Sequence, residues 1–189
     1  MSKTNNLYLG VDYSLAKSGV SIISIKDRKP TLELAYLITS NKDKDTHSRI
    51  DETVTEIKHV AEKHDITDII REEGFIGNAS TAVPIAKAHA IFEYQLMHKF
   101  NLDIVHNTSI KAWSRKILGK DRERQLKKEE PKKHSKLLIK EAVEKYYGSI
   151  PELYTPRGAY IDDVGDAIAL LTLWLEQQNL IDELHRHKG

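Results

Sequence analysis

The sequence Leu7–Ile25, LYLGVDYSLAKSGVSIISI, contains two β-rich runs separated by a short turn. The first run ends at Asp12 among small and turn-forming residues, and the second begins at Val20. Two such runs predict an antiparallel hairpin. A carboxylate at the end of a buried strand is costly unless something requires it. Asp12 is therefore the first candidate functional residue.

The composition limits the possible classes of protein. The chain has 189 residues, with 29 Lys or Arg, 28 Asp or Glu and no cysteine. This length favours one domain, residues 1–189, with a substantial core. Disulfides and thiolate metal sites are excluded. No stretch reaches the roughly 18 apolar residues of a membrane span, and the start of the chain has no apolar signal region. We expect a cytoplasmic protein without a membrane partner.

Positive charge is concentrated in one segment. Residues 111–140 contain 12 Lys or Arg and 4 Asp or Glu, a net of +8, so the rest of the chain carries about −7. This asymmetry indicates a polyanionic partner such as nucleic acid. The alternative is a solvated segment without a partner. The stretch 119–134 is basic and poor in apolar residues, and we expect it to be a mobile loop.

The remaining pattern predicts the fold class. A third strand is expected at 31–39, and shorter strands at 66–71 and 102–106. Helices are expected at 47–64, 81–100, from 108 onwards, 135–147 and 160–179. Three antiparallel strands followed by alternating helices and strands predict an α/β protein with a mixed five-stranded sheet flanked by helices.

Acidic residues stand at three distant places where an element begins or ends. They are Asp12 after the first strand, Glu72 or Glu73 after the fourth, and Asp162, Asp163 and Asp166 at the start of the last helix. Spacings of three and four residues place Asp166 on one helix face with either Asp163 or Asp162. These carboxylates converge if the first and fourth strands are neighbours.

Such a cluster of like charges must be relieved by protons or cations. Oxygen ligands without cysteine or a histidine cluster favour Mg²⁺ or Mn²⁺. Two such ions would activate water and stabilise the leaving oxygen of a phosphodiester. Each acid also has a structural alternative, because acids stabilise the first turn of a helix and Asp12 is suited to an Asx turn.

Three motifs resemble the RuvC-like Holliday junction resolvases of the RNase H-like superfamily. They are GVDYSLAKSGVSII at 10–23, REEGFIGNAST at 71–81 and YIDDVGDAIALL at 160–171. The resemblance covers about residues 7–175. The first motif departs from the family pattern, because Asp12-Tyr13-Ser14 stands where D-P-G is usual. The long basic segment is similar to that of phage-type members.

The resemblance implies a role for individual residues. The implied catalytic residues, which would also bind two Mg²⁺ or Mn²⁺ ions, are Asp12, Glu72, Asp163 and Asp166. The implied DNA-binding residues are Phe75, Lys111, Arg115, Lys116, Lys132, Lys133 and Lys136. Glu72 is favoured over Glu73 because it lies three residues before Phe75, and Asp163 over Asp162 because it gives the D-x-x-D spacing.

The resemblance implies a homodimeric endonuclease that makes paired nicks in four-way DNA junctions or other branched DNA, in a bacterial or phage-infected cell. One alternative is another RNase H-like nuclease, acting on RNA–DNA hybrids or flaps. A second is a junction-binding protein without activity. An actin-like ATPase would need two such domains, which 189 residues do not provide.

Overall fold

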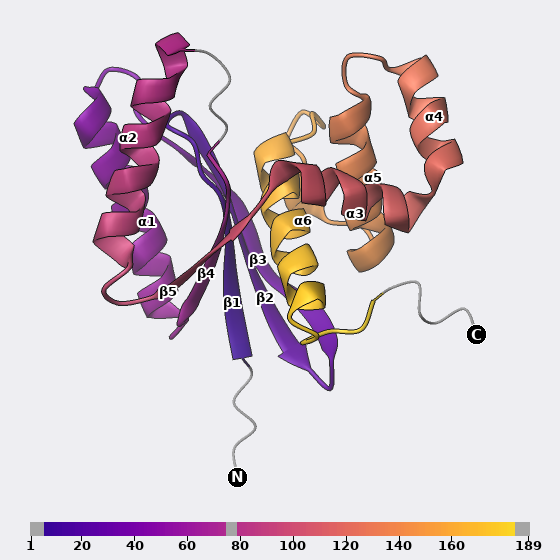
Figure 1. The fold of residues 1–189 in the computed structure, drawn as a ribbon, viewed down its shortest axis with the longest axis horizontal. Coiled ribbons are helices and arrows are strands. Elements are labelled where there is room, and N and C mark those ends of the chain that lie inside the picture. The colour runs from indigo at the N-terminus through magenta and orange to yellow at the C-terminus, as the bar shows by residue number, and fades with distance from the viewer. Residues whose placement is uncertain (1–5, 75–78, 184–189) are drawn as a thin grey trace.

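The computed structural model describes residues 6–74 and 79–183, which form a five-stranded sheet between two layers of helices (Figure 1). The strands are β1 (Asn6–Asp12), β2 (Lys17–Lys26), β3 (Lys29–Thr39), β4 (Asp68–Glu72) and β5 (Asn101–Val105). Their order is β3-β2-β1-β4-β5. Strands β1 to β3 pair antiparallel, whereas β4 and β5 run parallel to β1. The predicted mixed sheet is confirmed.

Helices cover both faces of this sheet. They are α1 (Thr46–Lys63), α2 (Ala79–Leu96), α3 (Asn107–Leu118), α4 (Lys120–Glu129), α5 (His134–Tyr147) and α6 (Asp162–Gln177), with a short 3₁₀ helix at Pro151–Leu153. In Figure 1, α1 and α2 lie on one face, and α6 lies on the other with α3 and α5 outside it. None of the helices in the described ranges is long and apolar enough to cross a membrane.

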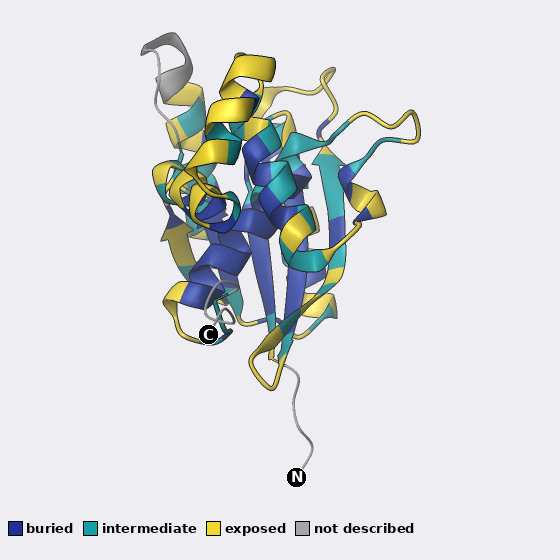
Figure 2. Ribbon diagram, turned by 90° about the vertical axis from the view of Figure 1, so that its right-hand side faces the viewer, coloured by how far each residue is buried: buried dark blue, intermediate teal, exposed yellow. Residues whose placement is uncertain are grey.

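The strands divide their side chains between two cores. Leu9 and Ile22 belong to the core beneath α1 and α2, whereas their neighbours Tyr8 and Ile23 belong to the core beneath α6. This alternation follows from the two-residue period of a strand. Because the central strands are covered on both faces, most of their residues are buried, as are most residues of α6 (Figure 2).

The segment 119–134 differs from the prediction of a mobile loop, because most of it is helix α4. Leu126 is its only buried residue, so hydrophobic periodicity gives little signal. Two ion pairs connect the helix to its neighbours. Arg122 contacts Glu141 of α5 at 2.6 and 2.7 Å, and Arg115 of α3 contacts Glu123 at the same two distances. The loop prediction is therefore wrong for Lys120–Glu129.

Candidate active site

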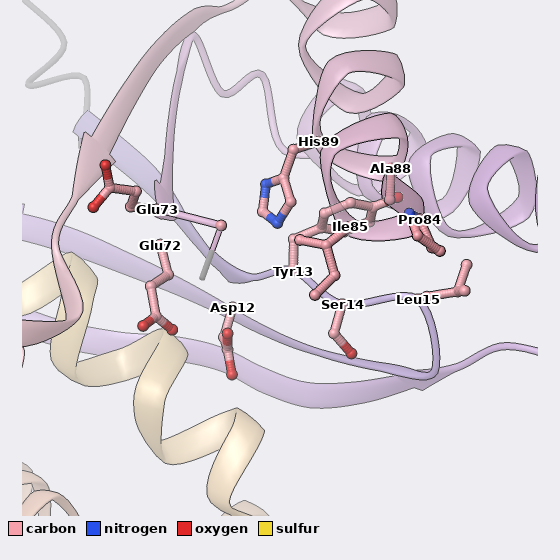
Figure 3. A pocket seen from close by; sticks show the side chains of 11 residues that line it. Asp12, Tyr13, Ser14, Leu15, Glu72, Glu73, Pro84, Ile85, Ala88 and His89 are labelled. Carbon is pink, nitrogen blue, oxygen red and sulfur yellow. The ribbon is translucent and has the colours of Figure 1, made fainter. Parts of the chain in front are cut away.

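Two carboxylates lie side by side at the carboxyl ends of two neighbouring strands. Strands β1 and β4 are parallel neighbours, and the last pair in their register is Val11 with Arg71. The next residues along the two strands are Asp12 and Glu72, whose side chains both extend toward the first turns of α6 (Figure 3). The first and fourth strands are therefore neighbours, which is the condition for the carboxylates to converge.

Helix α6 approaches β1 and β2 closely at two glycines. Gly19 is the cross-strand partner of Asp12, and a Cβ built on it would stand 1.8 Å from the carbonyl oxygen of Asp163. A Cβ on Gly10 would stand 2.6 Å from the carbonyl oxygen of Ala167. Only glycine permits so close an approach. The first turns of α6 are thereby held beside Asp12.

The electrostatics of the site show that four carboxylates are close together. Burial, and then the charges of Asp166 and Glu72, raise the pKa of Asp12 well above its ordinary value. Burial, and then the charges of Glu72 and Asp163, raise the pKa of Asp166 to about 7. The fold therefore holds a carboxylate cluster whose full ionisation is unfavourable without a counter-charge.

Glu72 is oriented by a residue that sequence reasoning missed. The side-chain amide of Asn107 donates a hydrogen bond of 2.5 Å to Glu72 Oε1. Asn107 is the first residue of α3 and follows β5, the neighbour of β4. Its place just after a strand adjacent to an acid-bearing strand is the signal that could have identified it.

The two acids considered as alternatives have other partners. Glu73 is exposed and points away from Asp12 (Figure 3), and its Oε2 lies 2.5 Å from Nδ1 of His106. Asp162 forms an ion pair with Lys136. The residues grouped around Asp12 are therefore Glu72, Asp163 and Asp166.

The predicted DNA-binding residues fall into three groups. Lys111 and Lys136 lie near enough to the carboxylates that the positive charge of each lowers the pKa of Asp166. Arg115 and Lys116, further along α3, form ion pairs with Glu123 and Glu183. Lys132 and Lys133 are exposed between α4 and α5 and form no ion pair within the described ranges. Phe75 lies outside the described residues.

The donor set of the cluster suits a hard divalent cation. All four side chains offer carboxylate oxygens, and the buried Oδ1 of Asp166 has no hydrogen-bond partner in the described part of the chain. Among the same residues, no three Asp, Glu or His side chains are arranged to hold a metal ion as they stand. The chemistry of the ligands fits, and their present arrangement is not that of a preformed site.

A pocket of about 320 Å³ opens beside Asp12 and Glu72. Tyr13, Leu15, Pro84, Ile85, Ala88 and His89 form most of its remaining wall (Figure 3). His89 is held by Arg71, whose Nη1 lies 3.0 Å from Nδ1 of the ring and which also pairs with Glu93. Burial, and then the charge of Arg71, lower the pKa of His89 to about 4. The imidazole is thus neutral at physiological pH.

The fold is that of RuvC-type Holliday junction resolvases. Thermus thermophilus RuvC in complex with a Holliday junction substrate aligns over 92% of this chain and 97% of its own, with a TM-score of 0.63 and 10% identity. The yeast mitochondrial Holliday junction resolvase Ydc2 aligns over 93% and 80%, with a TM-score of 0.61 and 15% identity. The fowlpox virus resolvase bound to junction DNA aligns over 91% and 98%, with a TM-score of 0.50 and 13% identity.

No family model matches the sequence, and the curated proteins include no match. The likeness is therefore one of fold, and the assignment of an activity depends on the site.

Proposed function

We propose that the protein is a metal-dependent endonuclease that resolves four-way DNA junctions. The observation that carries the proposal is the meeting of Asp12, Glu72, Asp163 and Asp166 at the strand ends of a RuvC-type fold. Four acids from three separate elements are brought together at a cost to the fold. A structural role explains each acid singly but does not explain their convergence.

The carboxylates would bind two Mg²⁺ or Mn²⁺ ions. When bound, such ions activate a water molecule and stabilise the leaving oxygen of a phosphodiester. Asp12 lies close to the other three acids, since the charges of Glu72, Asp163 and Asp166 all act on it. Asn107 would keep one oxygen of Glu72 engaged and so direct the other toward the cluster.

The basic residues around the cluster would bind the DNA backbone. Lys111 on α3 and Lys136 on α5 flank the carboxylates and would contact phosphates next to the scissile one. Lys132 and Lys133 extend the positive surface beyond them. Arg115 and Lys116, further along α3, would contribute less, because they pair with Glu123 and Glu183, whereas the partner of Lys136 is Asp162 beside the cluster.

The four-way junction has near two-fold symmetry, which suits a two-fold enzyme with two identical sites. We therefore propose a homodimer that makes paired nicks in opposite strands. The solved neighbours from T. thermophilus and fowlpox virus were determined with junction DNA, which supports branched DNA as the substrate. A phage-type origin stays a prediction.

The test compares three substrates with the purified protein. A labelled four-way junction, a linear duplex of the same sequence and an RNA–DNA hybrid are incubated with Mg²⁺ or with EDTA. We expect Mg²⁺-dependent nicks in the junction alone, placed symmetrically about the branch point. Cleavage of the hybrid alone would show that the protein is a nuclease but that the four-way junction is not its substrate. Junction binding without cleavage under any metal condition would overturn the enzymatic proposal.

A further inference from the structure

The pocket beside Asp12 and Glu72 is continuous with the carboxylate cluster. Both acids are among its lining residues, so a DNA strand with a phosphate at the cluster would place an adjoining nucleotide beside the pocket. The volume of about 320 Å³ is near the lower end of the range of about 300–1,000 Å³ for small-molecule pockets. This size suits one heterocycle.

The chemistry of the wall selects an uncharged planar group. The apolar side chains of Leu15, Ile85 and Ala88 line the pocket together with the rings of Tyr13 and His89, and no Lys or Arg is among the described lining residues. A phosphate would meet the carboxylates of Asp12, Glu72 and Glu73 and no cation from the described lining residues. A nucleobase is neutral and stacks well on aromatic and apolar surfaces.

The wall also contains polar atoms, which differ in how accessible they are. The hydroxyl of Tyr13 is buried and has no hydrogen-bond partner within the described ranges. Arg71 can only donate, so Nδ1 of His89 accepts its hydrogen bond and the ring proton resides on Nε2. The hydroxyl of Tyr13 is buried too deeply to meet a base unless its ring moves, so the Nε2–H of His89 is the donor that a base could use.

The aromatic part of the wall is held rigidly. The rings of Tyr13 and His89 pack edge to face with centroids 5.3 Å apart, and Tyr13 also packs on Phe92 at 4.8 Å. Arg71 fixes His89 from behind through its contacts with the ring and with Glu93. A pocket held in this way binds with less loss of conformational entropy.

We propose that this pocket takes an unstacked nucleobase from the strand whose phosphate lies at Asp12 and Glu72. The inference rests on the proposed nuclease function and adds to it a contact with the nucleotide next to the cut. A base at the branch point of an opened junction loses a stacking neighbour, which lowers the cost of extruding it. The pocket would thereby favour cutting close to the branch.

The test pairs a change in the pocket with a change in the base. Ile85→Trp fills the pocket, and Val83→Trp on the same helix is the matched control, because Val83 is 59% exposed and does not line the pocket. Each protein cuts an intact junction and junctions with a single abasic residue on either side of the cleaved bond. Circular dichroism and thermal melting check that each variant is folded.

We expect Ile85→Trp to cut the intact junction about 10-fold more slowly than wild type, the size of effect expected from removing one base–aromatic stack. Removing the base at one flanking position should slow the wild type similarly, and Ile85→Trp and wild type should then cut equally fast. Val83→Trp should match wild type throughout. If Ile85→Trp cuts the intact junction as fast as wild type, or is slowed equally on intact and abasic junctions, the pocket does not bind a base.

The wild type provides a test that needs no variant. If removal of either flanking base leaves its cutting rate unchanged, no base is bound and the inference is wrong even if Ile85→Trp fails to fold. Failure of the wild type to cut any junction is a distinct outcome, because it removes the proposed function together with the pocket.

Discussion

Gly19 and Asp163 are in main-chain contact, so close that a Cβ on Gly19 would stand 1.8 Å from the Asp163 carbonyl oxygen. Since Gly19 is also the cross-strand partner of Asp12, this contact sets the distance between the acid of β1 and the acids of α6. The site is therefore built by backbone packing as well as by its side chains.

Gly19→Ala should displace the start of α6 and separate Asp163 from Asp12. We expect the free energy of unfolding to fall by about 1–3 kcal/mol, as for other overpacked sites, and junction cleavage to fall further than binding. Urea unfolding and cleavage assays measure the two effects. Thr31→Ala, at an exposed position of β3, is the control. Wild-type cleavage by Gly19→Ala would contradict this role of the contact.

Asn107→Ala removes the hydrogen bond that orients Glu72. We expect a higher Mg²⁺ concentration for half-maximal cleavage and a maximal rate lower by about 10-fold, because partners of metal ligands tune affinity and activity by about 10- to 100-fold. Thr108→Ala, the exposed neighbour on α3, should behave as wild type. An unchanged Mg²⁺ dependence would show that Asn107 does not act on Glu72.

The raised pKa of Asp166 predicts a pH-dependent stability. With a pKa of about 7 in the fold and 3.8 as its ordinary value, the folded chain holds this proton over a range in which the unfolded chain has released it. Its contribution to the free energy of unfolding therefore falls as pH rises from about 4 to about 7. Asp12 acts in the same direction.

Asp166→Asn should remove this penalty. In EDTA we expect the variant to be more stable than wild type at pH 8 by about 1–2 kcal/mol, and to differ little near pH 4. Urea unfolding at both values measures the difference. Mg²⁺ at pH 8 should stabilise the wild type more than the variant. A variant less stable than wild type at pH 8 would show that Asp166 is not under strain from its neighbours.

The basic residues are tested by the salt dependence of junction binding. Lys132→Ala with Lys133→Ala, and separately Lys111→Ala with Lys136→Ala, should weaken binding and reduce the slope of log K against log salt by about 0.9 for each phosphate that the protein no longer neutralises. Lys63→Ala, exposed on α1 at the opposite face of the sheet, should leave the slope unchanged. If all variants gave the wild-type slope, these lysines would not contact the DNA backbone.

The sequence was most informative where an element ends in a charge. Asp12 and Glu72 follow β-rich runs, and the acids of α6 precede an apolar helix, so topology alone brings them together. Helix α4 was missed because its ion pairs to α3 and α5 connect residues 8 and 19 apart in sequence, which no local pattern records.

Other parts of the site depend on tertiary contacts that composition does not specify. In the sequence, Asn107 is only the first residue of a helix, and its contact with Glu72 depends on the pairing of β5 with β4. In the same way, nothing local to His89 indicates that Arg71 contacts its ring. Gly10 and Gly19, isolated within strands, did carry a signal of close backbone approach, although the sequence does not say what approaches.

The most direct test of the central claim is the cleavage of a strand-labelled four-way junction in Mg²⁺ by the wild type and Asp12→Asn, with binding of each protein measured in parallel. We predict symmetric nicks in opposite strands by the wild type, and a decrease in cleavage of at least about 100-fold in Asp12→Asn with binding retained. Cleavage retained by Asp12→Asn, or a wild type that binds the junction and never cuts it, would contradict the account.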